Sequence, residues 1–193
     1  MKPIKNLFIL FSFLMVLGLV ESCQKGEQMD RFIGEENKAQ NPFNGGEELT
    51  YVTDEGEQII MIANERVNEV HKENWSNYGD YFMIELDFMH FNSEGGNQFT
   101  INMNGRPRPK VDFSIYNNNQ IVFHNKTDLP LSKDHTPFVD SLLVMGNWEK
   151  DVFYFEKEQE ENKAYKMYYS TKNGIVHIDF SDGGFWELES IEW

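Results

Sequence analysis

The sequence has a single cysteine, Cys23, among 193 residues. A disulfide within the chain needs two thiols, so no disulfide framework can stabilise the fold. An apolar core must do so instead, and residues 48–193 are long enough to build one domain of ordinary size.

Motifs for catalysis and for cofactor binding are also missing. The sequence has no Gly-x-Ser-x-Gly nucleophile elbow and no glycine-rich phosphate loop. None of its five histidines forms a metal-binding pair at helical spacing. The acidic turns Asp54–Glu57 and Asp179–Gly184 lack the alternating oxygen ligands of a calcium loop. The sequence therefore predicts a protein that is not an enzyme and has no cofactor or metal site.

Basic residues are few, with 17 Lys and Arg against 32 Asp and Glu. Residues 1–22 contain Lys2, Lys5 and Glu21, which leaves 15 basic and 31 acidic residues, a formal charge of −16, on the rest. Nucleic-acid binding needs a basic surface, so this balance excludes nucleic acid as a partner. It favours solubility and cationic partners.

The N-terminus has the pattern of a secretory signal. Two lysines precede the apolar run Leu7–Val20, which is too short to cross a bilayer as a helix. The run ends in Leu19-Val20-Glu21-Ser22-Cys23, which resembles the lipobox of bacterial lipoproteins. The resemblance implies that residues 1–22 are a signal peptide and that the Cys23 thiol carries the lipid that anchors the chain to a membrane.

The residues behind Cys23 carry a second resemblance. Gln24-Lys25-Gly26-Glu27 resembles the export signal of Bacteroidetes surface lipoproteins, in which a lysine precedes acidic residues. The resemblance implies the outer membrane and the cell surface, with the periplasmic face as the alternative. Residues 24–47 show no apolar period, so we interpret residues 23–47 as the lipidated cysteine and a flexible linker.

From residue 48 onward the apolar residues alternate with polar ones, which is typical of strands. Turn signals recur between these segments, among them Asp54–Glu57, Asn117–Asn119 and Lys172–Gly174. The sequence predicts an all-β domain over residues 48–193, a single antiparallel β-sandwich or partly open barrel of about ten short strands. Arg66–Val70 is a further, weaker candidate for a strand. Helix, if present, is expected as one short segment near Asn64–Glu73 or Pro137–Val144. The expected strands are Leu49–Val52, Gln58–Ile62, Tyr81–Phe91, Phe99–Met103, Val111–Tyr116, Ile121–Phe123, Val152–Phe155, Tyr165–Ser170, Ile175–Phe180 and Phe185–Ile191.

The last fifty or so residues resemble the C-terminal unit of many small Bacteroidetes lipoproteins, especially flavobacterial ones. In that unit, strands rich in aromatic residues are followed by a Tyr-Tyr pair, a Gly-Ile step and a closing Asp-Gly…Trp hairpin. The matching residues here are Tyr168-Tyr169, Gly174-Ile175, Asp182-Gly183 and Trp186. The resemblance implies origin and localisation, and it implies no activity.

Three groups of residues are candidate sites. Aromatic residues in excess of what a core needs could bind a sugar ring or a peptide, although packing between strands also explains them; they are Trp148, Tyr168, Tyr169, Phe185 and Trp186. His177 and Asp179 are two residues apart and should share a sheet face. Glu85 and Asp87 should likewise project together from the strand Tyr81–Phe91, opposite an apolar face of Phe82, Ile84, Leu86 and Phe88.

Three hypotheses for function follow. The first is a non-enzymatic surface lipoprotein that binds a glycan, a protein or another component of the envelope. The second is a periplasm-facing barrel that binds a small apolar ligand or lipid in a lined cavity. The third is a hydrolase in which two carboxylates, such as Glu85 and Asp87, converge in a cleft.

Overall fold

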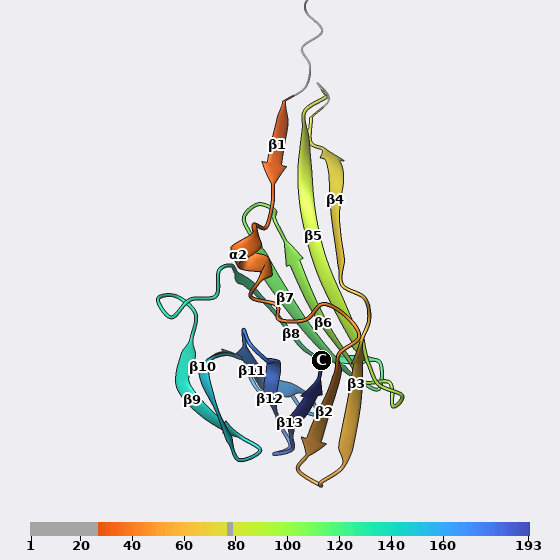
Figure 1. Ribbon diagram of the computed structural model, residues 1–193, viewed down its shortest axis with the longest axis vertical. Coiled ribbons are helices and arrows are strands. Elements are labelled where there is room, and N and C mark those ends of the chain that lie inside the picture. Colours follow the sequence, from red (N-terminus) through yellow and green to blue (C-terminus); the bar gives the residue numbers. More distant parts are fainter. Residues whose placement is uncertain (1–26, 77–78) are drawn as a thin grey trace, which may run out of the picture. The chain divides into compact units, whose positions relative to one another are not determined.

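The computed structural model describes residues 27–76 and 79–193. The fold is almost entirely β, as the sequence predicts (Figure 1). Its elements are β1 (Gln28–Arg31), α2 (Glu35–Lys38), β2 (Glu48–Thr53), β3 (Gln58–Ala63), β4 (Val67–Asn74), β5 (Tyr81–Asn92), β6 (Gln98–Asn104), β7 (Lys110–Asn117), β8 (Gln120–Asp128), β9 (Phe138–Val144), β10 (Asn147–Glu156), β11 (Ala164–Ser170), β12 (Gly174–Phe180) and β13 (Phe185–Glu192).

Contacts divide the chain into two units. The small unit comprises the chain up to Asp30 together with Lys72–Met83, and the main unit comprises Arg31–His71 and Ile84–Trp193. Within the small unit, the Glu27 N–H donates to the Asp80 carboxylate at 2.8 Å and the Glu27 carbonyl accepts the Tyr81 N–H at 3.0 Å.

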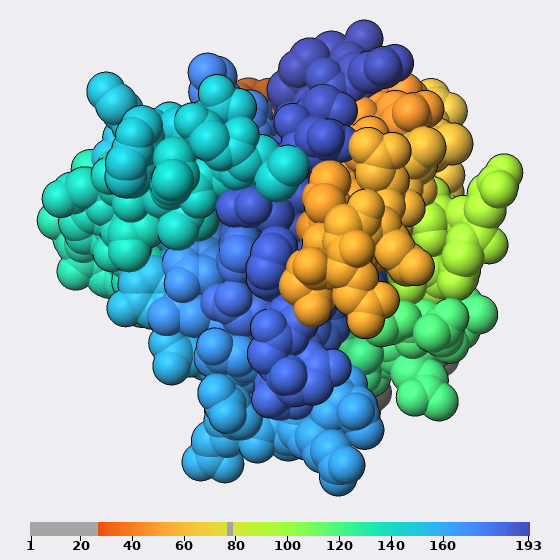
Figure 2. Space-filling model, turned by 90° about the horizontal axis from the view of Figure 1, so that it is seen from below, coloured from red at the N-terminus to blue at the C-terminus, as the bar shows by residue number. Residues whose placement is uncertain are grey.

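The main unit is built on one antiparallel sheet that curls into a half-barrel. The strand order is β8-β7-β6-β5-β3-β2-β13-β12-β11-β10-β9, and β1 and β4 also pair with β5. The partly open barrel is thus the correct one of the two expected architectures. In Figure 2 the β2–β3 hairpin (orange) lies beside the C-terminal strands (blue), in agreement with the pairing of β2 with β13.

The core lies inside the curl, where strands distant in the order face each other. The ring of Phe113 on β7 packs against Tyr169 on β11 at 4.8 Å and against Phe155 on β10 at 5.2 Å. The ring of Tyr51 on β2 meets that of Phe99 on β6 at 5.2 Å. These inward rings lie on strands in which apolar and polar residues alternate in the sequence. Curling brings the apolar faces of distant strands together, and the burial of their apolar area explains the curl.

Glu85 and Asp87 share one face of β5 as the sequence predicts, but that face, and not the apolar face of Leu86 and Phe88, points into the core. The inward residues are Glu85, Asp87, Met89 and Phe91, with exposed fractions of 7%, 2%, 0% and 1%. Leu86 and Phe88 lie on the opposite, outer face and are only partly buried, whereas Ile84 on that face is 6% exposed. Alternation identifies two faces of a strand but not which one is inside, and here the inner face includes two carboxylates with partners.

The segment before residue 48 also differs from the expected linker. Residues 31–47 contain α2 and bury the side chains of Ile33 and Phe43, each 1% exposed. The Phe43 ring packs edge-on against Phe91 at 4.9 Å and stacks on Trp193 at 5.8 Å. A short helix near Asn64–Glu73 or Pro137–Val144 is not formed, because β4 and β9 occupy those positions, and β4 overlaps the alternative strand expected at Arg66–Val70. Isolated apolar residues such as Ile33 and Phe43 give no periodic signal, so the sequence pattern missed the packing of residues 31–47.

Candidate functional site

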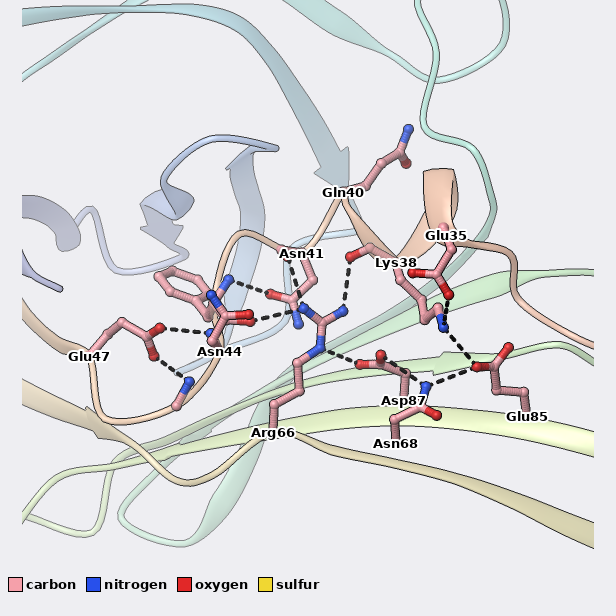
Figure 3. Close-up of polar contacts among 12 residues, drawn as sticks. Glu35, Lys38, Gln40, Asn41, Asn44, Glu47, Arg66, Asn68, Glu85 and Asp87 are labelled. Carbon is pink, nitrogen blue, oxygen red and sulfur yellow. Dashed lines mark hydrogen bonds and ion pairs between the residues drawn. The ribbon is translucent and has the colours of Figure 1, made fainter.

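Two buried carboxylates occupy the inner face of β5 and bind the segment that precedes β2 (Figure 3). The Arg66 guanidinium donates from Nε to Asp87 Oδ1 at 2.8 Å. The same guanidinium donates to the carbonyls of Lys38 at 2.9 Å and Phe43 at 3.0 Å. One cation therefore connects β5 to α2 and to the loop behind it.

Glu85 is held by three donors. Its Oε2 accepts the Ile33 N–H at 2.8 Å, and its Oε1 accepts the Asn68 amide at 2.9 Å and the Lys38 ammonium at 3.0 Å. Burial by itself raises the pKa of Glu85, but the hydrogen bonds from Asn68, Ile33 and Lys38 outweigh burial and lower the pKa below its ordinary value. Glu85 is thus held as an anion.

These contacts give no support to a hydrolase built on Glu85 and Asp87. A general acid in glycoside hydrolysis needs a raised pKa and a proton to donate, whereas the pKa of Glu85 is lowered. Both side chains are also buried, at 7% and 2% exposure, and their oxygens already accept hydrogen bonds from Lys38, Asn68 and Arg66. The arrangement is that of a structural clamp.

A second group has the composition of a catalytic triad without its geometry. On the outer face of β7 and β8, the Ser114 hydroxyl lies 3.2 Å from His124 Nδ1, and an Asp112 carboxylate oxygen lies 3.1 Å from the same nitrogen. A triad uses both ring nitrogens, one to accept the serine proton and the other to donate to the carboxylate. Because both contacts fall on Nδ1, this group cannot activate Ser114 in that manner.

The outer face of β10–β13 carries four aromatic rings in a line. Tyr154 lies opposite Tyr168 between β10 and β11, and Tyr168 lies opposite His177 between β11 and β12. The ring centroids are 6.2 Å apart for Tyr154 and Tyr168, 5.4 Å for Tyr168 and His177, and 5.7 Å for His177 and Phe185 on β13. All four side chains are half-buried. We call Tyr154, Tyr168, His177 and Phe185 the aromatic row.

A lysine covers one end of the aromatic row. The Lys166 ammonium lies 4.6 Å from the ring centroid of Tyr154 and 5.4 Å from that of Tyr168, and it pairs with Glu156 at 3.0 Å. These rings therefore bind an ammonium group through their faces. Burial raises the pKa of the Tyr168 phenol despite the nearby lysine, so this phenol is neutral and can donate a hydrogen bond.

Carboxylates flank the other end. His177 Nε2 lies 2.9 Å from Asp179 Oδ1, so the juxtaposition expected from their spacing is present. His177 Nδ1 lies 3.7 Å from Glu187 Oε1, which is longer than a hydrogen bond. With Glu156, three carboxylates surround the row and one lysine opposes them, so a basic partner is favoured electrostatically.

The five aromatic residues singled out in the sequence fall in three places. Tyr168 and Phe185 belong to the aromatic row. Tyr169 and Trp186 are core residues, 1% and 7% exposed, and the Tyr169 hydroxyl donates to the Gln40 carbonyl at 2.7 Å. Trp148 is 65% exposed and lies opposite Leu143 in the β9–β10 ladder, apart from the row.

Tyr154 is a member of the row that the sequence reasoning missed. It lies between the buried Phe153 and Phe155 in a strand that the sequence predicts, so alternation alone would have placed it outward. Of the lipidation and export residues, Cys23, Gln24 and Lys25 lie outside the described residues. Glu27 is described, and its backbone makes the contacts with Asp80 and Tyr81 given above.

Comparisons with known proteins give no assignment: no protein-family model, curated protein or solved structure matches the chain. Within residues 27–76 and 79–193, no three His, Cys, Asp or Glu residues are grouped so that they could hold a metal ion. No helix in this described part of the chain is long and apolar enough to cross a membrane.

Proposed function

We propose that this protein is a lipid-anchored lipoprotein of the cell envelope, exposed at the outer surface, whose domain binds a polypeptide that carries basic side chains. The binding surface is the aromatic row with its flanking carboxylates. The observation that carries the proposal is the position of the Lys166 ammonium over Tyr154 and Tyr168, beside an excess of carboxylates.

Three properties of this surface support a polypeptide partner. Tyrosine and other aromatic residues supply much of the binding energy at protein interfaces. An arginine or lysine of a partner could repeat the contact that Lys166 makes within the chain, and Asp179 and Glu187 could accept its hydrogen bonds. The net charge of −15 accelerates the approach of a basic partner.

The lipid anchor is supported by the sequence of the N-terminal segment. An n-region with Lys2 and Lys5, the apolar run Leu7–Val20 and Cys23 at its end are the parts that lipidation requires. We expect the domain to be removed by a protease added to intact cells, and to be protected when Lys25→Ala and Glu27→Ala are combined. Protection of the unaltered chain would instead place the domain at the periplasmic face.

The alternative of an apolar ligand inside the barrel has less support. Such a ligand needs a lined cavity of several hundred Å³. The described interior is occupied by its own rings, with Phe113 within about 5 Å of both Phe155 and Tyr169.

A binding titration tests the role of the aromatic row. The full chain in detergent would be titrated with an alternating Arg-Gly octapeptide and with the matching Glu-Gly peptide. Asp179→Asn combined with Glu187→Gln removes two charges at the row, and Glu158→Gln combined with Glu161→Gln removes two exposed charges away from it. We expect the first pair to weaken Arg-Gly binding about tenfold and the second by less than about twofold.

The same titration has outcomes that would contradict the proposal. Equal weakening by both pairs would mean that the peptide responds only to net charge. Equal affinity for the Glu-Gly peptide would mean that basic side chains are not recognised. Tyr168→Leu, which keeps the side chain apolar and removes the ring, should weaken Arg-Gly binding, whereas Tyr169→Phe, inside the core, should not.

A further inference from the structure

A hollow of about 330 Å³ lies on the outer face of strands β5–β8, away from the strands of the aromatic row. Apart from the core residue Met103, its lining comes from outward positions of four neighbouring strands. The cross-strand pairs Phe88↔Asn102, Asn102↔Asp112 and Asp112↔Lys126 set the row that crosses it. A volume of this size lies at the lower end of small-ligand sites, which suits one or two sugar rings.

One part of the lining is apolar. Phe88 and Leu86 project outward from β5, because the buried carboxylates Glu85 and Asp87 take the inward positions. The Phe88 ring meets the imidazole of His90 edge-on at 5.7 Å, which fixes the orientation of the ring. An aromatic ring held in this way can pack against the C–H face of a pyranose.

The rest of the lining is polar, and part of it has no partner. Within the described chain, neither the Asn102 amide nor the Lys126 ammonium makes a hydrogen bond or ion pair. Asn104 uses only its oxygen, which accepts the Arg106 N–H at 2.8 Å, so its NH₂ group can still donate. Half-buried amides that keep free donors and acceptors can bind vicinal hydroxyl groups.

The lining of the hollow carries more basic than acidic side chains, although the chain is acidic overall. Lys110 and Lys126 both line it, and Asp112 is their only acidic companion in the lining. Lys110 lies 3.5 Å from Asp128. Asp112 lies opposite Lys126 in the β7–β8 ladder but contacts His124 at 3.1 Å, and among the described residues no carboxylate lies within ion-pair distance of the Lys126 ammonium. In a chain with 32 acidic and 17 basic residues, this combination favours an anionic ligand.

We propose that this hollow binds a hexuronate residue of an acidic glycan. Phe88 packs against the sugar ring, Asn102 and Asn104 bind its hydroxyl groups, and Lys126 pairs with its carboxylate. Aromatic contact, free amides and an unpaired ammonium together match a sugar acid better than a simple anion, which needs no ring. The proposal does not depend on the aromatic row, because the two sites share no residue.

The test is a titration of the full chain in detergent with tetragalacturonate, and with maltotetraose as a neutral control of similar size. Binding would be followed by isothermal calorimetry up to about 10 mM ligand. Lys126→Gln removes the unpaired charge, and Lys172→Gln removes one exposed charge elsewhere. We expect tetragalacturonate to bind more tightly than maltotetraose, and Lys126→Gln to weaken it about tenfold while Lys172→Gln changes it by less than about twofold.

Phe88→Leu separates ring contact from charge. This substitution keeps an apolar side chain on the outer face, and we expect it to weaken tetragalacturonate binding by about tenfold with the fold unchanged by circular dichroism. The proposal is overturned by no binding of tetragalacturonate, by equal binding of maltotetraose, or by equal effects of Lys126→Gln and Lys172→Gln. Binding of the Arg-Gly peptide to the aromatic row is measured separately, so failure at either site is distinguishable.

Discussion

Replacing Arg66 with alanine should destabilise the main unit more than any surface substitution. The side chain is 17% exposed and its partner Asp87 is 2% exposed, so the lost guanidinium leaves a buried carboxylate whose remaining partner is Asn68 at 3.4 Å. Removing one member of a buried ion pair costs about 3–5 kcal/mol. The three backbone carbonyls that Arg66 also binds place the expected loss in the upper part of that range.

Equilibrium unfolding in urea, followed by circular dichroism, measures this loss as a lower transition midpoint at constant slope. Arg108→Ala is the matched control, since Arg108 is 69% exposed and pairs with Asp128 at 2.8 Å. A surface ion pair contributes about 0–1 kcal/mol, so the control should change stability by no more than that. Equal effects of the two substitutions, or a loss below about 1 kcal/mol for Arg66→Ala, would refute the clamp.

Three further predictions concern the same segment. The pKa of Glu85 is lower in the folded protein than its ordinary value, so the ionised carboxylate stabilises the fold fully at neutral pH and this stabilisation is lost as pH falls below about 4.5. Glu85→Gln should therefore flatten the dependence of the unfolding free energy on pH in that acidic range. Phe43→Ala should cost about 3–5 kcal/mol in urea unfolding, whereas a flexible linker would give no loss. Gly174→Ala should lower the thermal midpoint of unfolding, because φ is +75° there and the added Cβ would lie 2.3 Å from the Phe43 ring. Gly183→Ala is the control: its φ of +94° is also positive, but the added Cβ meets no atom within 4 Å, so the midpoint should fall less.

The sequence predicts the strands well where side chains alternate and turn residues separate them. In β6 and β7 the pairs Phe99↔Ile115 and Ile101↔Phe113 place the expected residues inside. The turn at Asn118 and Asn119 uses positive φ values of 50° and 61°, which asparagine tolerates. Local periodicity therefore carries most of the strand assignment.

Long-range contacts explain what the sequence reasoning missed. Nothing within β5 shows that Glu85 and Asp87 face inward, because the groups that neutralise them, Lys38 and Arg66, lie 47 and 21 residues away. The packing of residues 31–47 against β5 depends on the same contacts of Glu85 and Arg66 with that segment. Burial of a carboxylate follows from a partner and not from periodicity.

The candidate binding surface was only partly foreseen. The spacing of His177 and Asp179 predicts their shared face, and adjacent aromatic pairs predict that one member of each faces outward, as Tyr168 and Phe185 do. The line that the rings form depends on the register of the three successive hairpins of β10–β13, which includes a shift between Tyr168 and Tyr169 that alternation does not specify.

Photo-crosslinking in intact cells tests the central claim most directly. Benzoylphenylalanine would replace Tyr168 in the aromatic row, and in a control it would replace Ile121, which is 48% exposed on β8. We expect a polypeptide adduct from position 168 alone, attached at a segment rich in Lys and Arg, and lost when Asp179→Asn and Glu187→Gln are combined. Adducts shared by both positions, or no adduct at position 168, would contradict the proposed binding surface.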